Sequence, residues 1–321
     1  MKPILLSLLN IAAEDKARLN AHYEIIEIKN LDEASTLSPE TLARVTALYG
    51  SATKPLSLEF LEALPNLQVI SSFGVGYDPY DEEYIRRRQI RLGYTPDVLN
   101  DCVADLAMAL MLDVARQVSV SDRYVRAGRW LSDGPYPLGV SVTGKRLGIL
   151  GMGRIGLEIA ARAKGFRMQI YYHNRNPRQD LAEDYHYIAS PIELAKAVDY
   201  LIVATPATAE TEKIVNQQVL EALGPQSYLI NIARGAVVDE AALVKALQNK
   251  TIAGAGLDVF VNEPQVPEAL FALDNVVITP HVASATVETR NAMRELSIQN
   301  FLHFAEFGEV KVAVPWAQYG A

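Results

Sequence analysis

Cysteine and long hydrophobic runs are both scarce in this sequence. The 321 residues contain one cysteine, Cys102, which excludes an internal disulfide framework and is typical of a reducing compartment. No stretch approaches the roughly 20 apolar residues of a membrane span. The short apolar run at the start soon gives way to charged residues, so we interpret it as a strand and not as a signal peptide. We therefore expect a cytoplasmic protein that does not bind a membrane.

Positive charge is also in the minority. The chain has 30 Lys and Arg residues against 38 Asp and Glu residues, for a formal net charge of −8. Proteins that bind nucleic acids usually carry a basic domain or a basic stripe, and this sequence has neither. The charge pattern therefore indicates that nucleic acid is not a partner.

Apolar runs alternate with amphipathic stretches along nearly the whole chain, which is typical of α/β proteins with parallel sheets. The length suits two domains. We therefore predict two doubly wound parallel-sheet domains, a flavodoxin-like substrate domain and a Rossmann cofactor domain. The expected strands are residues 4–9, 24–28, 46–49, 69–72 and 90–93 in the first domain, and 147–150, 168–172, 200–204, 228–232, 254–259 and 276–279 in the second.

Two helices and one irregular segment set the expected domain organisation. Helical patterns over residues 101–116 and 288–304 follow the two sets of strands, and the last helix is expected to pack back on the first domain. The substrate domain then comprises residues 1–98 and 286–321, and the dinucleotide-binding domain comprises residues 99–285. Residues 128–144 are rich in glycine, proline and aromatics without a clear period. We expect them to form part of a dimerisation arm, at about residues 117–145, that packs on a second copy in a homodimer.

A glycine-rich turn follows the first strand of the second block. Gly151, Gly153 and Gly156 have the spacing G-x-G-x-x-G, and Arg154 and Ile155 open the helix pattern that follows. The glycines permit a tight turn, a close approach of the backbone to a pyrophosphate, and close packing of the helix on the strand. The free N–H groups of the helix start would bind the phosphates. This context predicts a dinucleotide site.

The segment after the next strand bears on which dinucleotide binds. NAD-binding proteins commonly place a carboxylate there to bind the ribose 2′-hydroxyl. This chain has no acid at that strand end and instead carries His173, Asn174, Arg175 and Arg178. Because arginine beside this turn suits a 2′-phosphate, we predict that NADP(H) is preferred and that NAD(H) remains possible.

Three later segments each end a predicted strand with polar residues: NIARG at 231–235, LDVFVNEP at 257–264 and TPHVAS at 279–284. The carboxyl ends of parallel strands face the ligand crevice. An arginine, Arg234, can bind a carboxylate in a bidentate way and polarise the adjacent carbonyl. A histidine, His281, can donate a proton to that carbonyl oxygen. A glutamate, Glu263, can orient the histidine and favour its protonated form.

Each of these residues has a structural explanation when it is taken alone. A single histidine after a strand is more often structural than catalytic, a single arginine usually lies at the surface, and Glu-Pro is a common turn. Their occurrence together, in this order and beyond a dinucleotide fingerprint, favours an enzyme that reduces 2-oxo acids.

These segments resemble those of the D-isomer-specific 2-hydroxyacid dehydrogenases. The matching pieces are GVGYD at 74–78, GMGRIG at 151–156, ATPAT at 204–208, NIARG, LDVFVNEP and TPHVAS, and they occur in the family's order over most of the chain. Within the family, SSFGVGYD and the turn at residues 173–175 are most similar to the glyoxylate/hydroxypyruvate reductases. The resemblance implies NAD(P)H-dependent reduction of a small 2-oxo acid to the D-2-hydroxy acid.

The resemblance also implies roles for individual residues. Arg234 should bind the substrate carboxylate and carbonyl, and Glu263 should pair with His281, the acid and base. Val75 and Gly76 should offer backbone N–H groups to the carboxylate. Asp258 should hold the nicotinamide carboxamide. The further expected cofactor residues are Thr205, Pro206, Thr211, Ile232 and Ala283. The family implies a homodimer built through the cofactor domain, and we expect no metal.

Other functions stay open at this point. The same fold could serve a dinucleotide-sensing interaction protein of the corepressor type, although the set of Arg234, Glu263 and His281 argues against it. A phosphoglycerate-type dehydrogenase is a further alternative. Reductases of bulkier acids, such as hydroxyphenylpyruvate or 2-ketogluconate, would use the same residues. The substrate's side chain would be selected by first-domain loops and by Trp130 or Tyr136 of a second copy, which spacing alone does not define.

Overall fold

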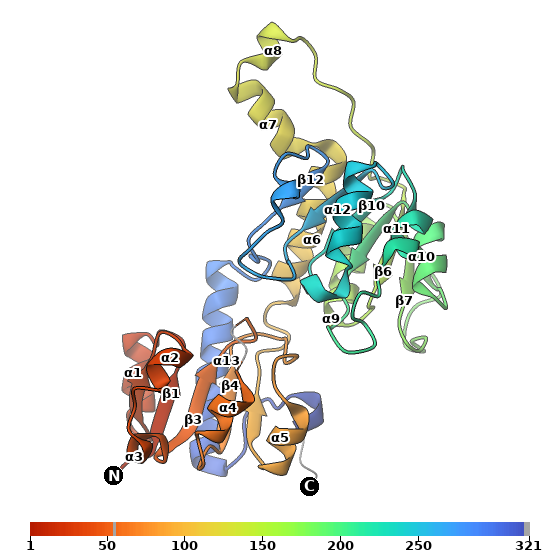
Figure 1. Ribbon diagram of the computed structural model, residues 1–321. Coiled ribbons are helices and arrows are strands. Elements are labelled where there is room, and N and C mark those ends of the chain that lie inside the picture. Colours follow the sequence, from red (N-terminus) through yellow and green to blue (C-terminus); the bar gives the residue numbers. More distant parts are fainter. Residues whose placement is uncertain (54–55, 318–321) are drawn as a thin grey trace. The chain divides into compact units, whose positions relative to one another are not determined.

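The structure, a computed structural model, describes residues 1–53 and 56–317 and divides into two compact units (Figure 1). Unit 1 comprises Met1–Leu99 and Thr286–Ala321, and unit 2 comprises Asn100–Ala285. The prediction of two doubly wound parallel-sheet domains is confirmed, because each unit holds one sheet whose strands all pair in parallel. Among the described helices, none has both the length and the apolar character that crossing a membrane requires.

Unit 1 contains a five-stranded sheet of order β2-β1-β3-β4-β5, which is the flavodoxin-like order. Its strands are β1 (Ile4–Ser7), β2 (Glu24–Glu27), β3 (Val45–Gly50), β4 (Val69–Ser72) and β5 (Arg91–Gly93). Its helices are α1 (Ala13–Leu19), α2 (Leu31–Ala34), α3 (Pro39–Leu42), α4 (Leu58–Glu62), α5 (Glu82–Arg87) and α13 (Val287–Phe307), and η3 (Pro315–Ala317) is a short 3-10 turn.

The last helix, α13, packs against the sheet of unit 1, as its sequence pattern predicts. The ring of Phe301 is fully buried and meets the ring of Tyr49 edge to face, with 5.7 Å between the centroids. The buried Asn300 amide donates to the Tyr94 carbonyl (3.3 Å), and a Cβ at Gly93 would lie 2.6 Å from that amide nitrogen. The chain therefore returns to unit 1 after it has built unit 2.

Unit 2 contains a seven-stranded sheet of order β12-β11-β10-β9-β6-β7-β8. Its strands are β6 (Arg146–Leu150), β7 (Gln169–His173), β8 (Tyr185–Tyr187), β9 (Tyr200–Val203), β10 (Tyr228–Asn231), β11 (Gly254–Leu257) and β12 (Val276–Ile278). Its larger helices are α6 (Asn100–Arg116), α9 (Arg154–Gly165), α10 (Pro191–Ala197), α11 (Gln217–Leu223) and α12 (Glu240–Gln248), and η1 (Gly235–Val237) and η2 (Glu268–Leu270) are 3-10 turns.

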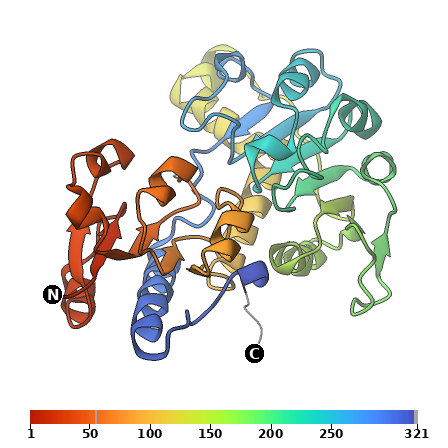
Figure 2. The ribbon, with the colours of Figure 1, turned by 60° about the horizontal axis from the view of Figure 1, so that its bottom comes forward.

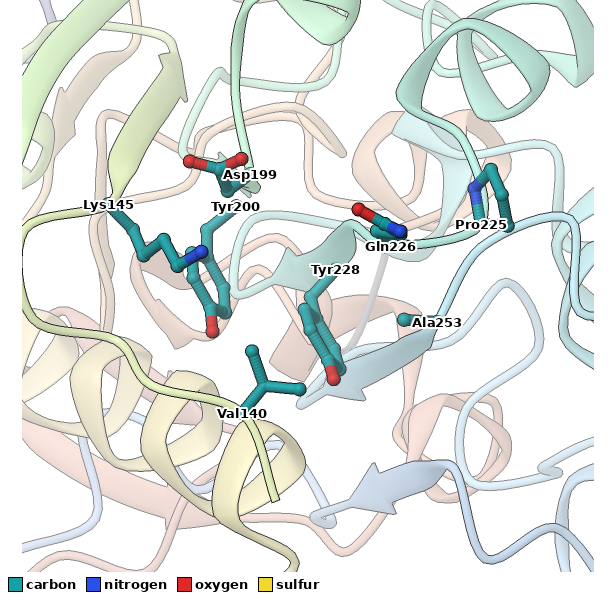
Figure 3. A pocket seen from close by; sticks show the side chains of 8 residues that line it. All are labelled: Val140, Lys145, Asp199, Tyr200, Pro225, Gln226, Tyr228 and Ala253. Carbon is teal, nitrogen blue, oxygen red and sulfur yellow. The ribbon is translucent and has the colours of Figure 1, made fainter. Parts of the chain in front are cut away.

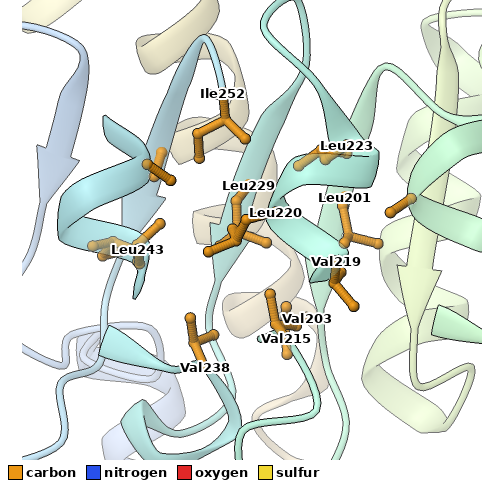
Figure 4. Close-up of a cluster of buried hydrophobic side chains, with 14 of the residues drawn as sticks. Leu201, Val203, Val215, Val219, Leu220, Leu223, Leu229, Val238, Leu243 and Ile252 are labelled. Atoms are coloured by element: carbon orange, nitrogen blue, oxygen red, sulfur yellow. The ribbon is translucent and has the colours of Figure 1, made fainter. Parts of the chain in front are cut away.

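Helices cover both faces of this sheet. Helices α6 and α9 pack against each other, and their ribbons lie side by side in Figure 2. Helix α6 lies so close to β11 that a Cβ at Gly256 would be 2.9 Å from the Leu110 side chain. A cluster of buried aliphatic side chains, which includes Leu220, Leu229 and Leu243, fills the space under α11 and α12 (Figure 4). The strands are apolar because both of their faces are buried.

An arm (residues 117–145) follows α6 and projects from the rest of unit 2 (Figure 1). It contains α7 (Val118–Arg126) and α8 (Arg129–Ser132). The sequence pattern of residues 128–144, which has no clear period, did not predict α8. Gly128 has a φ of +73°, which lets the chain turn and start a second helix, and an ion pair between Arg129 and Asp133 (2.7 Å) spans that helix.

Candidate active site

The candidate site lies at the carboxyl edge of the sheet of unit 2. The loops that leave β6, β7, β9, β10, β11 and β12 at this edge carry the predicted cofactor and catalytic residues of unit 2. In an open parallel sheet, ligands bind in the crevice outside this edge, so the topology gathers residues that are distant in sequence.

The glycine turn (residues 151–156) has the geometry that a dinucleotide needs. Gly151 has a φ of +104°, and a Cβ there would lie 2.7 Å from the backbone nitrogen of Thr205. A Cβ at Gly156 would lie 2.4 Å from the Gly151 carbonyl oxygen, so the helix α9 can begin close to β6 only with glycine. Gly153 starts that helix, and a Cβ there would meet nothing within 4 Å. The turn therefore leaves open space at the helix start, which fits a pyrophosphate.

The loop after β7 is tied to the glycine turn through Met152. The Asn174 side-chain oxygen accepts from the Met152 backbone N–H (2.6 Å), and an Arg178 guanidinium N–H donates to the Met152 carbonyl (3.0 Å). Arg178 also pairs with Asp180, and this hydrogen bond lowers the pKa of Asp180. Asn174 and Arg178 thus shape the turn, while Arg175 stays 77% exposed. The His173 ring Nδ1 lies 2.8 Å from the Ile188 carbonyl oxygen.

The loop after β9 carries three of the predicted cofactor residues. Thr205 lies against Gly151, as the close approach of its backbone nitrogen shows. The Thr211 hydroxyl donates to the Pro206 carbonyl (2.6 Å) and accepts from the Thr208 backbone N–H (2.8 Å). These bonds close the loop on itself next to the glycine turn.

The turn after β10 presents Arg234. The buried Asn231 side chain accepts from the Ala233 backbone N–H (3.1 Å) and donates to the Arg234 carbonyl (3.0 Å). A Cβ at Gly235 would lie 2.0 Å from the Phe260 carbonyl carbon, so only glycine allows this turn to press against the segment after β11. Ile232, another predicted cofactor residue, is buried in the same turn.

Glu263 and His281 are in contact. The His281 ring Nδ1 lies 2.7 Å from Glu263 Oε2, and the other oxygen of Glu263 accepts from the Phe260 backbone N–H (3.1 Å). The two side chains are 27% and 30% exposed, so the pair is half-buried and still reachable. With Nδ1–H donating to the carboxylate, Nε2 is left to exchange a proton.

Asp258 organises the loop that carries His281. Its carboxylate is completely buried and accepts from the Thr279 hydroxyl (2.7 Å) and from the backbone N–H groups of Val282 (2.8 Å) and Ala283 (2.9 Å). The Asp258 carbonyl accepts from the His281 backbone N–H (2.9 Å). His281 itself has a φ of +50°, an uncommon conformation for a residue with a side chain. These bonds hold that conformation, and the expected contact of Asp258 with the nicotinamide stays a prediction.

Val75 and Gly76 follow β4 in unit 1. The preceding Gly74 has a φ of +145°, donates its backbone N–H to the Thr95 hydroxyl (3.0 Å), and accepts from the Thr95 backbone N–H (2.9 Å). Because they come just after the last residue of β4, these residues also lie at a carboxyl edge, that of the sheet of unit 1. Their assignment to the substrate carboxylate stays a prediction.

A pocket of about 380 Å³ lies elsewhere on unit 2, at the amino ends of the strands (Figure 3). Tyr200 and Tyr228, the first residues of β9 and β10, stack their rings there at 5.2 Å, and Lys145 and Asp199 also line it. It lies at the opposite end of the strands from the candidate site. Across the described residues, no group of three or more His, Cys, Asp or Glu side chains is placed to hold a metal ion.

Sequence reasoning missed several residues that build this site. Asn231, Thr279 and Glu210 each hold a loop or pair with a predicted residue. Asn231 has a local signal, because an asparagine where the chain turns commonly bonds the backbone two residues on. Thr279 and Glu210 have none, because their partners lie 21 and 35 positions away in the chain.

The sequence matches the family model for the NAD-binding domain of D-isomer-specific 2-hydroxyacid dehydrogenases over residues 108–283. Two similar relatives come from plants. The chain is 43% identical to glyoxylate/hydroxypyruvate reductase A HPR2 of Arabidopsis thaliana, over 89% of this chain and 91% of the relative. It is 47% identical to hydroxyphenylpyruvate reductase of Plectranthus scutellarioides, over 81% of this chain and 83% of the relative.

A solved structure is similar over the whole chain. It is the NADPH-dependent glyoxylate/hydroxypyruvate reductase of Sinorhizobium meliloti in complex with NADP and malonate, with a TM-score of 0.93 and 42% sequence identity. The match covers 100% of this chain and 99% of the other. The fold is therefore shared with a solved reductase over the whole chain.

Proposed function

This chain belongs to the D-isomer-specific 2-hydroxyacid dehydrogenases, enzymes that bind a nicotinamide dinucleotide, and we propose that it reduces glyoxylate or hydroxypyruvate to the D-2-hydroxy acid. The contact between Glu263 and His281, at 2.7 Å beside the Arg234 turn, carries the proposal. Relatives named for glyoxylate and hydroxypyruvate support the choice of substrate.

In this mechanism each residue acts on a different part of the 2-oxo acid. Arg234 binds the carboxylate and polarises the adjacent carbonyl. His281 gives a proton from Nε2 to the carbonyl oxygen, and Glu263 keeps the ring oriented while it is charged. The reduced nicotinamide, when bound, supplies the hydride that the carbonyl carbon accepts. The hydride adds to the carbonyl carbon and the proton from His281 Nε2 adds to the carbonyl oxygen, which together give the hydroxyl group.

We propose NADPH as the preferred reductant, with NADH as a weaker substitute. The end of β7 is followed by an exposed guanidinium at Arg175, and no carboxylate stands among residues 173–178. A carboxylate there would repel a 2′-phosphate, whereas a guanidinium binds phosphate through paired hydrogen bonds. The similar Sinorhizobium meliloti enzyme is described as NADPH-dependent and was solved with NADP.

Initial rates test the proposal directly. Glyoxylate, hydroxypyruvate, hydroxyphenylpyruvate and 2-ketogluconate should each be assayed with NADPH and with NADH at equal concentrations. We expect the highest kcat/KM for glyoxylate or hydroxypyruvate with NADPH. A clear preference for hydroxyphenylpyruvate, the substrate named for the relative from Plectranthus scutellarioides, would overturn the substrate assignment and leave the family assignment unchanged.

We also propose that the arm packs on a second copy in a homodimer. Trp130, Leu131 and Leu138 are 65%, 95% and 96% exposed, which is unusual for three large apolar side chains in one segment. We expect light scattering at micromolar concentration to give a dimer mass, and Leu131→Asp to lower it. Val287→Asp, at a residue of unit 1 that is 74% exposed, is the control and should stay dimeric. A monomer mass for the unmodified protein would contradict the proposal.

A further inference from the structure

An ion pair joins the two loops that flank the glycine turn. Nη2 of Arg175, in the loop after β7, lies 3.7 Å from Oε2 of Glu210, in the loop after β9. In the sheet, β6 lies between β7 and β9, and the glycine turn is the loop that leaves β6. No acid stands at the end of β7 itself, and the carboxylate next to Arg175 comes from the loop after β9.

Glu210 is held in place by its own loop. The Thr208 hydroxyl donates to Glu210 Oε2 (2.7 Å), and the Thr208 backbone N–H donates to the Thr211 hydroxyl (2.8 Å). The hydrogen bond from Thr208, with help from the nearby Arg175 charge, lowers the pKa of Glu210. The carboxylate is therefore charged at neutral pH and fixed near the guanidinium.

The pair is easily opened. Arg175 is 77% exposed and Glu210 is 67% exposed, and 3.7 Å is long for a charge-assisted hydrogen bond. Exposed pairs of this kind are weak, whereas an arginine can bind a phosphate through two parallel N–H donors. A 2′-phosphate would therefore take the guanidinium from the carboxylate, and it would do so against the nearby negative charge.

We infer that Glu210 is a specificity-determining residue. Its carboxylate competes with the 2′-phosphate of NADPH for Arg175, and this competition reduces the preference of the enzyme for NADPH over NADH. The inference rests on the proposed role of Arg175 in binding the 2′-phosphate. The cofactor preference then depends on two loops, because the loop after β7 supplies the guanidinium and the loop after β9 supplies the competing carboxylate.

Binding of adenosine fragments tests this without turnover. Dissociation constants for adenosine 2′,5′-bisphosphate and for 5′-AMP should be measured by calorimetry on the full chain and on Glu210→Gln. Glutamine keeps an oxygen that can accept from Thr208 but removes the charge. We expect the bisphosphate to bind about two- to fivefold more tightly to the variant, the range for one exposed pair, and 5′-AMP to bind as before.

Glu212→Gln is the matched control, because Glu212 is an exposed glutamate of the same loop and the change removes the same charge. It should leave both dissociation constants unchanged. An equal gain in Glu212→Gln would show that net charge, and not the pair, is responsible, and would overturn the inference. No change in Glu210→Gln would overturn it as well.

Arg175→Ala separates this inference from the cofactor proposal. If Arg175→Ala leaves bisphosphate binding unchanged, Arg175 does not bind the 2′-phosphate and both ideas fail. If Arg175→Ala weakens binding but Glu210→Gln has no effect, the role of Glu210 alone fails. In the double variant, most of the gain from Glu210→Gln should disappear, and an undiminished gain would contradict competition for the guanidinium.

Discussion

Two parts of one sheet edge are held in very different ways. The loops after β11 and β12 fix His281 through a fully buried Asp258, two backbone N–H groups and a 2.7 Å contact with Glu263. The loops after β7 and β9 meet through Arg175 and Glu210, at 3.7 Å and mostly in solvent. The first part is rigidly constructed, and the second is a single weak pair.

The difference matches what each part must do. Proton transfer needs an atom placed to within a fraction of an ångström, so multiple hydrogen bonds to His281 and its loop are an advantage. Choice between two dinucleotides needs only a difference in charge, which an exposed guanidinium provides. A bond to a buried charged group contributes about 1.5–3 kcal/mol, and an exposed ion pair contributes about 0–1 kcal/mol. Substitutions in the two parts should therefore have effects of different size and kind.

The largest effect is expected at His281. We predict that His281→Ala lowers kcat for reduction by about 10²–10⁴-fold, the usual contribution of a general acid, because no other group then delivers the proton. Binding of the reduced dinucleotide, followed by fluorescence titration, should be nearly unchanged. Turnover close to that of the unmodified enzyme would contradict the proposed mechanism. The loops after β11 and β12 would then have no larger effect on the reaction than the loops after β7 and β9.

Glu263 should show a smaller effect. In Glu263→Gln the imidazole loses the carboxylate that orients its ring, so we predict that kcat for reduction falls by about 10- to 100-fold, the range for one charge-assisted bond.

Steady-state rates for both proteins check this prediction. Gln265→Ala is a useful control, because it changes a side chain two residues along without touching the pair and should leave kcat in place. An unchanged kcat for Glu263→Gln would mean that Glu263 only shapes its turn through the Phe260 N–H.

Much of the fold could be predicted because strands buried on both faces are strongly apolar. Strand β4 was expected over the residues that the structure gives, and β9 and β10 were each expected to end one residue later. Strand β8 was missed, because Tyr185–Tyr187 is only three residues long and lies at the edge of the sheet after a polar segment. Helix α8 was missed because its four residues are too few to show a period.

The candidate site was predictable where its chemistry has a local pattern. The polar ends of strands pointed to Glu263 and His281, and the structure places those two side chains in contact. The pattern did not show that Asp258 holds the His281 loop, since that requires knowing that β11 and β12 are neighbours. It also did not show Glu210, whose meeting with Arg175 depends on the order of β9, β6 and β7.

The smallest of these effects is expected at Arg175. It tests whether the loops after β7 and β9 act on cofactor choice alone. A charge-assisted bond from the guanidinium to a 2′-phosphate is worth about 1.5–3 kcal/mol, and exposure puts its value toward the low end. We therefore predict that the enzyme prefers NADPH over NADH by about tenfold in kcat/KM. Arg175→Ala should erode this by raising KM for NADPH alone, with kcat unchanged, because the contact lies far from the reacting atoms in the dinucleotide.

Two further measurements make the Arg175 prediction decisive. Added salt should weaken NADPH binding more than NADH binding, since screening acts on the extra phosphate at an exposed site. Arg167→Ala, a charge removal just before β7 at the opposite end of that strand, should leave the preference intact. Equal use of both dinucleotides by the unmodified enzyme, or an equal loss for both in Arg175→Ala, would show that the loops after β7 and β9 do not select the cofactor. His281 and Glu263 would keep their proposed roles in that case, because the two parts of the edge share no side chain in these contacts.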